Sequence, residues 1–379
     1  MSLLSKQRGP IAVYGATGYT GRLVAAELAD MGAEFVLSGR DGEKLDRLAS
    51  SLPGEPPTEV VSIDQSESLR ELLDECSVVI DCAGPFLLYG EPVLKAAVDT
   101  GTHYLDTTGE QPYMKLALDD YSEAAEEAGV AVIPGMGFDY VPGDMLAALT
   151  AEGMGELDEV TLAYRASFQP TRGTMRSALE MMKGGDVEWR KLSWQPASQK
   201  VSRGSFDFGE PIGRKRMTRY PAGEQITVPR HISTRLVRTM LTADSLAPGA
   251  VDFLLPALTR PTSIAMRTPA KGLVGAAIGR LPEGANEENR RNAKFTIVCE
   301  VKRGKRMRRG TISGRDIYGL TARLVTKGAV TCAGRGFGGK GFLAPSQAFD
   351  PREFLSDLED FSVEWRVEPA VGENPDPRD

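Results

Sequence analysis

The sequence predicts an α/β protein: a Rossmann-type, doubly wound parallel sheet in the N-terminal part, followed by a second α+β domain. Two observations support this prediction. A glycine-rich turn lies between a short apolar run and an amphipathic stretch, and comparable runs and stretches alternate as far as residue 150. This alternation is typical of βαβ units. The turn consists of Gly15, Ala16, Thr17, Gly18, Tyr19, Thr20 and Gly21.

The glycine turn is the first candidate site. Ile11–Tyr14 before it is predicted to be a strand, and Arg22–Met31 after it a helix. Gly15 permits a tight turn, Gly18 leaves room for a pyrophosphate, and Gly21 lets the helix approach the strand. Free N–H groups and the positive end of the helix dipole then favour phosphate. The spacing differs from the common G-x-G-x-x-G, and a turn without any ligand is the alternative.

The next predicted strand, residues 33–38, indicates which cofactor binds. NAD enzymes usually carry an acidic residue at this strand end to hold the ribose 2′-OH. Here the chain has Ser38 and Arg40, with Lys44 one helical turn later. A guanidinium binds a 2′-phosphate that a carboxylate would repel, so we expect NADP(H). Asp41 argues against this unless it caps the next helix, and Arg40 as a solvated loop residue is the alternative.

Further strands are predicted at residues 59–63, 78–82, 103–106 and 130–134, and helices at 41–50, from 67 onward, and at 92–100, 113–128 and 142–151. Asp64 either caps the helix from residue 67, which we favour, or approaches the adenine. The small residues Ala83, Gly84 and Pro85 end the fourth strand and would admit the nicotinamide ribose; a turn set by Pro85 is the alternative reading. Because ligands bind beyond the carboxyl ends of such strands, residues 83–89, 106–110 and 135–144 are expected to form the walls of the site.

The pattern changes near residue 156. We expect a strand at residues 160–165, helices at 174–182 and 317–327, and a hairpin pairing 295–301 with 308–313. The predicted domains are residues 1–150, which bind NADP, and 151–335, which bind substrate or form a dimer interface. Residues 336–379 are expected to return to the core, with a helix at 351–358 and a disordered tail from 369.

Composition excludes several classes of function. The chain has 379 residues and a net charge of −7, which argues against general nucleic-acid binding. The N-terminus lacks the apolar run of a signal peptide, and the most apolar stretch, residues 246–278, is interrupted by charges. We therefore expect a cytoplasmic protein without a transmembrane segment and with reduced cysteines. With two histidines and no clustered ligands, no metal site is expected.

Several motifs resemble those of a known family. Residues 13–21, 82–86 and 104–110 look like the NADP-binding domain of saccharopine dehydrogenase-like oxidoreductases. Residues 227–231, 314–319 and 341–345 are similar to the branch that contains mycobacterial trans-acting enoyl reductases. The resemblance implies an NADPH-linked reduction, an acyl substrate that is free or carried on a carrier protein, and a homodimer through the sheet of the second domain.

The reaction itself stays open. None of the ten tyrosines has a lysine four residues later, which excludes the Tyr-x-x-x-Lys mechanism of short-chain dehydrogenases. A reduction needs one proton donor, and we name Tyr89 and Asp139 as catalytic hypotheses, beside the alternative that each is a cap or an exposed side chain. Reduction of an enoyl-type acyl substrate leads. Oxidoreduction of an amino-acid C–N bond and a non-catalytic NADP-binding scaffold are the alternatives.

A basic run, Lys302–Arg309, stands out in an acidic chain. The first interpretation, which we slightly favour, is a hairpin edge that charge protects from aggregation. The second is a docking surface for an anionic partner, such as an acyl-carrier domain, a phospholipid surface or a second subunit.

Overall fold

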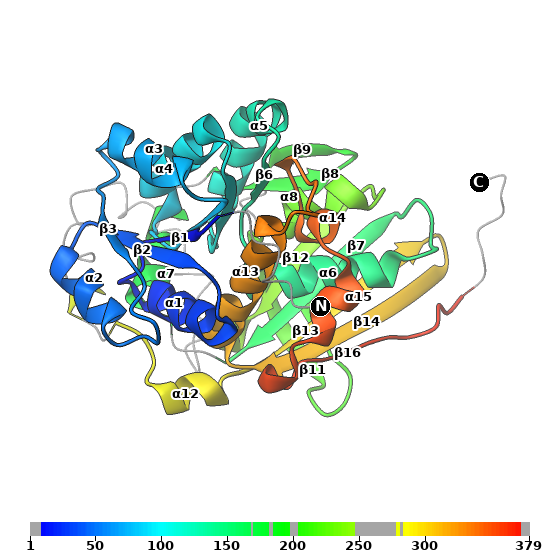
Figure 1. The fold of residues 1–379 in the computed structure, drawn as a ribbon. Helices are drawn as coiled ribbons and strands as arrows, with labels where there is room; N and C mark the ends of the chain where they lie inside the picture. Colours follow the sequence, from blue (N-terminus) through cyan, green and yellow to red (C-terminus); the bar gives the residue numbers. More distant parts are fainter. Residues whose placement is uncertain are drawn as a thin grey trace, which may run out of the picture. The chain divides into compact units, whose positions relative to one another are not determined.

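A sheet of seven strands, in which every neighbouring pair is parallel, forms the centre of the first compact unit, Met1–Val141 with Tyr318–Ala348. The computed structural model describes residues 9–167, 170–181, 185–197, 204–246, 278–280 and 283–372. The order of the strands in the sheet is β15-β6-β5-β4-β1-β2-β3 (Figure 1). Their bounds are β1 (Ile11–Tyr14), β2 (Phe35–Gly39), β3 (Thr58–Val60), β4 (Val78–Asp81), β5 (His103–Asp106), β6 (Ala131–Ile133) and β15 (Gly341–Phe342).

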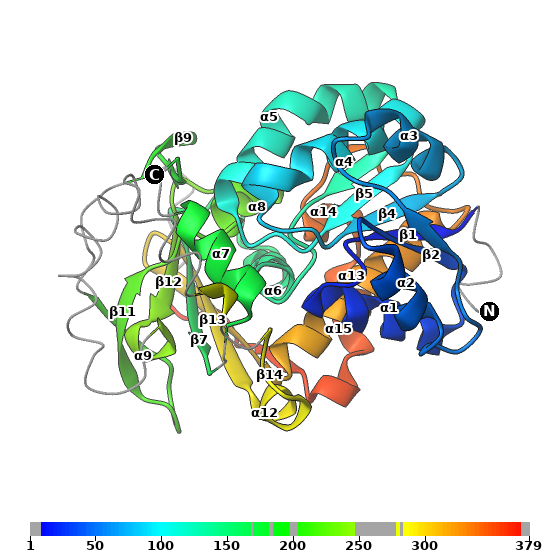
Figure 2. The ribbon, with the colours of Figure 1, turned by 90° about the vertical axis from the view of Figure 1, so that its left-hand side faces the viewer.

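Helices cover both faces of this sheet. Figures 1 and 2 show α3, α4 and α5 over one face, with α1 and α13 over the other. The predicted doubly wound Rossmann-type sheet is therefore confirmed. The helices are α1 (Tyr19–Met31), α2 (Gly42–Ala49), α3 (Ser66–Asp74), α4 (Phe86–Thr100), α5 (Gln111–Glu127), α13 (Ile317–Ala333) and α14 (Pro345–Ala348).

Local sequence explains the elements that position the site. All four residues of β1 are buried, as expected for a parallel strand that is covered on both faces. Helix α1 ends where Gly32 adopts a left-handed conformation, φ 67°, and its N–H group reaches the carbonyls of Ala29 and Leu28. Helix α2 begins at Asp41, whose side chain accepts a hydrogen bond from the Lys44 backbone N–H.

The second unit, Pro142–Ile317 with Phe349–Asp379, is built on a mixed sheet of order β10-β11-β12-β7-β13-β14-β16. Only the β12–β7 pair in it is parallel among the described residues. The strands are β7 (Glu159–Ala166), β10 (Gly204–Asp207), β11 (Arg214–Arg219), β12 (Val237–Thr242), β13 (Lys294–Arg303), β14 (Arg306–Arg315) and β16 (Glu364–Val367), with a separate hairpin of β8 (Val187–Arg190) and β9 (Ser193–Pro196). The helices are α6 (Val141–Ala151), α7 (Arg172–Met181), α8 (Glu224–His231), α9 (Ala243–Leu246), α12 (Glu287–Asn292), α15 (Pro351–Ser356) and the 3₁₀ turn η2 (Glu359–Phe361).

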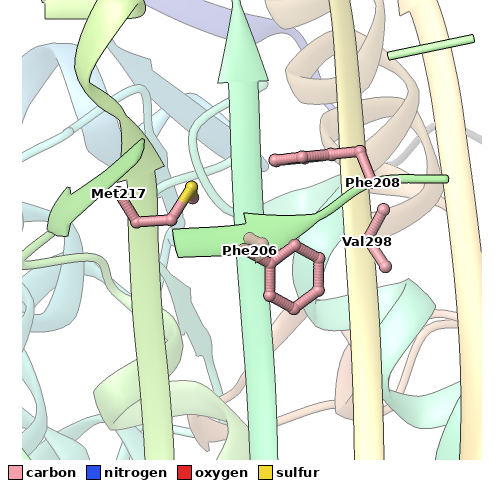
Figure 3. Close-up of a cluster of buried hydrophobic side chains, with 5 residues drawn as sticks. Phe206, Phe208, Met217 and Val298 are labelled. Carbon is pink, nitrogen blue, oxygen red and sulfur yellow. The ribbon is translucent and has the colours of Figure 1, made fainter. Parts of the chain in front are cut away.

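Strand β10 folds over the face of its own sheet. Although β10 is an edge strand, Phe206 and Phe208 pack with Met217 of β11 and Val298 of β13 (Figure 3). The guanidinium of Arg309 on β14 lies 5.6 Å from the centre of the Phe206 ring. These contacts curl the sheet and bury its central strands.

Three details correct the sequence predictions. The helix expected at residues 92–100 begins at Phe86. Asp64 does not cap α3, because the capping position is Gln65, without a side-chain hydrogen bond, and the Asp64 carboxylate accepts from the Ser62 hydroxyl instead. The tail is ordered at Val371, whose backbone exchanges two hydrogen bonds with Met307, so the prediction of disorder from residue 369 is wrong there.

Other predictions fall elsewhere. Residues 247–277 and 373–379, which hold most of the apolar stretch and the end of the tail, lie outside the described residues. The division into units differs from the expected boundaries, because all of α6 after Val141 is assigned to the second unit and all of α13 after Ile317 to the first. No helix in the described part of the chain combines the length and the apolar character needed to cross a membrane.

Candidate functional site

The glycine turn is shaped by close backbone contacts. Gly15 has φ +74°, and a Cβ atom there would lie 3.0 Å from the backbone N of Ala83. A Cβ on Gly21 would lie 2.4 Å from the Gly15 carbonyl oxygen. Helix α1 starts at Gly18 without a side-chain cap and without an acidic residue in its first turn. Its N-terminal N–H groups therefore meet no acidic side chain of that turn, and the turn fits a pyrophosphate.

Two hydrogen bonds hold this turn in place. Arg22 Nη1 donates to the Thr17 carbonyl at 2.7 Å. The backbone N–H of Ala16 donates to the Ser38 carbonyl at 3.1 Å. The second bond joins the glycine turn to the end of β2, where the cofactor-selecting residues are expected.

The residues at the ends of β2 and β3 converge on one phenol. Burial raises the pKa of Tyr14, as do the carboxylates of Asp81 and Asp64, whereas Arg40 lowers it. Arg40 and Asp64 thus act on the same hydroxyl, and Arg40 itself is exposed. This arrangement leaves the Arg40 guanidinium accessible to an anionic ligand.

Asp41 has a structural role that answers the objection it raised. Its carboxylate caps α2 and lies 2.7 Å from the Lys44 ammonium, so it is already partnered. Ser38 is fully buried, and its hydroxyl has no hydrogen-bond partner among the described residues. Of the three residues expected to select NADP, Arg40 is the one whose placement suits a 2′-phosphate best.

The loops after β4, β5 and β6 meet at the carboxyl edge of the sheet. The carboxylate of Asp81 accepts from the Ala83 N–H at 2.8 Å. Asp106 Oδ1 accepts from the Thr108 N–H at 2.9 Å and from the Gly135 N–H at 2.7 Å. Burial raises the pKa of Asp81 to about 8 and that of Asp106 to about 7.

The two catalytic hypotheses occupy different settings at this edge. Tyr89 lies in the first turn of α4 and is 42% exposed. Asp139 is half-buried, and a Cβ atom on Gly109 would lie 3.2 Å from its Oδ2. Of the other acids and phenols of these loops, Glu110 is fully buried, and Tyr140 donates to the Gly109 carbonyl at 2.6 Å. Neither of those two is poised to give up a proton.

Sequence reasoning missed the contribution of α13. The Tyr318 ring packs edge-on against Tyr19, with ring centres 5.3 Å apart. Thr321 Oγ1 accepts from the Phe138 N–H at 3.0 Å. The motif at residues 314–319 was a signal, but its place among strands of the second domain gave no reason to assign it to the glycine turn.

The second unit holds its own buried polar groups. His231 Nε2 lies 2.8 Å from Asp144 Oδ1, and Asp144 is fully buried. The Tyr164 hydroxyl donates to the buried carboxylate of Glu224. A Cβ atom on Gly143 would collide with both of these last two side chains, so glycine is required there.

Much of the basic run serves the fold. Arg303 Nη1 donates to the Met154 carbonyl at 3.0 Å. Arg308 Nη1 donates to the carbonyls of Thr150 and Glu152, beside the C-terminus of α6. Arg309 pairs with Glu300 at 3.1 Å. These three guanidiniums thus have partners within the unit.

Comparison with known proteins identifies the first unit. Residues 11–133 match the family model of the saccharopine dehydrogenase NADP-binding domain. A trans-acting enoyl reductase of Mycobacterium tuberculosis is 31% identical over 209 residues, 52% of this chain and 50% of that protein. A saccharopine dehydrogenase-like oxidoreductase of Bos taurus is 34% identical over 192 residues, 45% of each chain. The chain spans about half the length of these curated relatives.

A solved structure extends the likeness in fold. Apo saccharopine dehydrogenase (L-Glu forming) from Saccharomyces cerevisiae superposes with a TM-score of 0.56 at 14% identity. The match covers 95% of this chain and 100% of that one. The chain therefore has the saccharopine dehydrogenase fold and carries an NADP-binding domain of the saccharopine dehydrogenase family.

Proposed function

We propose that the protein is an NADPH-dependent reductase that acts on an unsaturated, enoyl-type acyl substrate. The observation that carries the proposal is the glycine turn, where Gly15 and Gly21 are required by contacts of 3.0 Å and 2.4 Å and the start of α1 carries no side-chain cap. The name of the mycobacterial relatives supports the reductase reading and the acyl substrate.

The residues divide the work of holding the cofactor. The turn from Gly15 to Gly21 would hold the pyrophosphate, and Arg40 the 2′-phosphate. Ala83, Gly84 and Pro85 would lie beside the nicotinamide ribose. When bound, NADPH supplies the hydride. The chain must then exclude water, orient the acceptor and provide one proton.

For that proton we retain two hypotheses. Tyr89 is exposed on α4, and Asp139 lies beside Gly109 on the loop after β6. Tyr89→Phe and Asp139→Asn each remove a proton donor with little change in shape. A hundredfold loss of turnover with unchanged NADPH affinity is expected for the true donor, since general acids contribute roughly 10²–10⁴-fold. Intact turnover in both variants removes both hypotheses.

The first experiment is a fluorescence titration with NADPH and NADH. Wild-type protein is expected to prefer NADPH, and Arg40→Ala to weaken NADPH binding by about 10–100-fold while leaving NADH binding unchanged, because a charge-assisted hydrogen bond contributes roughly 1.5–3 kcal/mol. Arg47→Ala is the matched control, since Arg47 is exposed and its 3.9 Å ion pair with Glu43 is a surface contact. Absence of binding by either cofactor would overturn the proposal.

One observation favours an alternative substrate. Nε of Arg165 on β7 is buried and lacks a hydrogen-bond partner among the described residues. A substrate carboxylate would satisfy it, as an amino-acid C–N oxidoreductase requires. NADPH oxidation with enoyl thioesters but not with oxo acid and amino acid pairs separates the two functions. Cofactor binding with no oxidation under either condition favours the non-catalytic scaffold.

A further inference from the structure

Two carboxylates stand side by side beneath the proposed cofactor edge. Asp81 ends β4 and Asp106 ends β5, and the two residues are direct partners in the register of the parallel pair. Neighbouring strands lie about 4.8 Å apart. Both side chains are fully buried. The fold therefore places two acids next to each other and away from water.

Each acid ties down loop backbone. Asp81 holds the loop after β4 through the Ala83 N–H, and Asp106 holds the loops after β5 and β6 through Thr108 and Gly135. The second oxygen of Asp81 accepts from the Tyr104 hydroxyl at 3.3 Å. The pair thus connects three loops that we expect to wall the site.

No positive charge compensates the pair. Among the described residues, neither acid forms an ion pair, and the titratable groups that act on the pair are acids, phenols and a thiol. These groups are Tyr14 on β1, Cys82 after β4, Tyr104 on β5, Glu110 before α5 and Tyr113 on α5. Two adjacent anions in such surroundings are strongly disfavoured, and one shared proton removes the conflict.

We propose that Asp81 and Asp106 form one acid–carboxylate pair that shares a single proton, positions the three loops, and takes up further proton when cofactor binds. The raised pKa values of both groups agree with this arrangement. The pair positions the site and is not itself assigned contact with substrate.

The glycine turn provides the coupling to cofactor. Tyr14, immediately before Gly15, is the register partner of Asp81. The Ala83 N–H group that Asp81 holds lies against Gly15. An anionic dinucleotide at this turn adds negative charge near the pair, which favours its protonated form. Proton uptake on binding follows, with buffer as the source. This step rests on the proposed function.

The pair is tested first without cofactor. Infrared spectra of the wild-type protein at neutral pH are expected to contain the carbonyl stretch of a protonated, buried carboxyl group. The double variant Asp81→Asn, Asp106→Asn should lose this band and still fold, because amide oxygens can accept the same N–H bonds. Asp74→Asn is the control, since Asp74 is exposed on α3, and should keep the band. A wild-type spectrum without the band would overturn the shared proton.

The coupling is tested by calorimetry of NADPH binding in buffers with different ionisation enthalpies. Wild type and Asp74→Asn should take up a fraction of one proton per NADPH, and the double variant none. Equal uptake in all three proteins would overturn the coupling. Failure of wild type to bind NADPH would overturn the proposed function and the coupling with it, while the carboxyl band still decides the pair.

Discussion

The backbone N–H of Phe86 donates to Glu110 Oε1 at 2.8 Å, and the adjacent Leu87 N–H donates to Oε2 at 2.9 Å. A fully buried carboxylate from the loop after β5 therefore caps the first turn of α4. The contact explains why α4 begins at Phe86 rather than near residue 92, because it satisfies N–H groups that a helix start leaves open. It also fixes the loop that carries Ala83, Gly84 and Pro85.

Glu110→Ala is expected to destabilise the protein by about 1–3 kcal/mol or more, since two helix N–H groups lose their acceptor. Glu110→Gln keeps one acceptor oxygen and should lose less. Urea unfolding measures both free energies, and NADPH titration should show weaker binding for the alanine variant. Equal stability of the alanine variant and wild type would show that water replaces the carboxylate without cost.

Gly21→Ala is expected to destabilise the first unit, because its Cβ would lie 2.4 Å from the Gly15 carbonyl oxygen. Overpacking of this kind costs about 1–3 kcal/mol. NADPH binding should fall with it, since the turn must open. Gly336→Ala is the control, because nothing lies within 4 Å of the added methyl. Thermal unfolding and fluorescence titration compare the two, and equal behaviour would refute the tight packing of this turn.

The first unit could be predicted in unusual detail because its signals are local. Buried parallel strands such as Ile11–Tyr14 appear as continuous apolar runs, and the glycine turn stands directly after one of them. The cap at Asp41 is likewise written within a few residues. In these places, the local pattern and the tertiary structure require the same residues.

The parts that could not be predicted depend on contacts between distant residues. Nothing in the sequence near Glu110 indicates that it caps a helix that starts at Phe86. The pairing of Asp81 with Asp106 requires knowledge that β4 and β5 are neighbours in register. Asp64 failed as a cap because the Ser62 hydroxyl, two residues away, competed for its carboxylate.

The basic run makes a prediction about stability that separates its residues. Arg308→Gln removes donors to carbonyls beside the C-terminus of α6, and we expect a loss of about 1.5–3 kcal/mol. Lys302→Gln, in the same hairpin, should stay within about 0.5 kcal/mol of wild type. Urea unfolding compares them. If both variants were as stable as wild type, the run would have no structural role and the docking interpretation would gain weight.

Docking has its own test. Reversal of three charges in the run, at Lys302, Lys305 and Arg306, spares the three arginines that have described partners in the unit. If the run binds an acyl-carrier domain, turnover of carrier-linked substrate should fall while turnover of the free thioester changes little. Equal effects on both substrates would refute docking.

The buried acids predict how stability depends on pH. Asp81 and Asp106 have pKa values of about 8 and about 7 in the folded protein, above the roughly 3.9 of an unfolded aspartate. Between these values the folded state binds more protons than the unfolded state, so the contribution of the pair is present at low pH and is lost as pH rises through the folded pKa values. Each pKa unit corresponds to about 1.4 kcal/mol.

The double variant Asp81→Asn, Asp106→Asn cannot titrate at these positions and should lack this loss. Urea unfolding of wild type and variant across the range from acidic to alkaline pH measures the difference in free energy of unfolding. We expect the variant to gain relative to wild type as pH rises through about 7–8. A constant difference across the range would mean that the pair binds no extra proton in the folded state. A relative gain for wild type at high pH would mean that both acids are stabilised as carboxylates, which the buried, cation-free surroundings of the pair argue against.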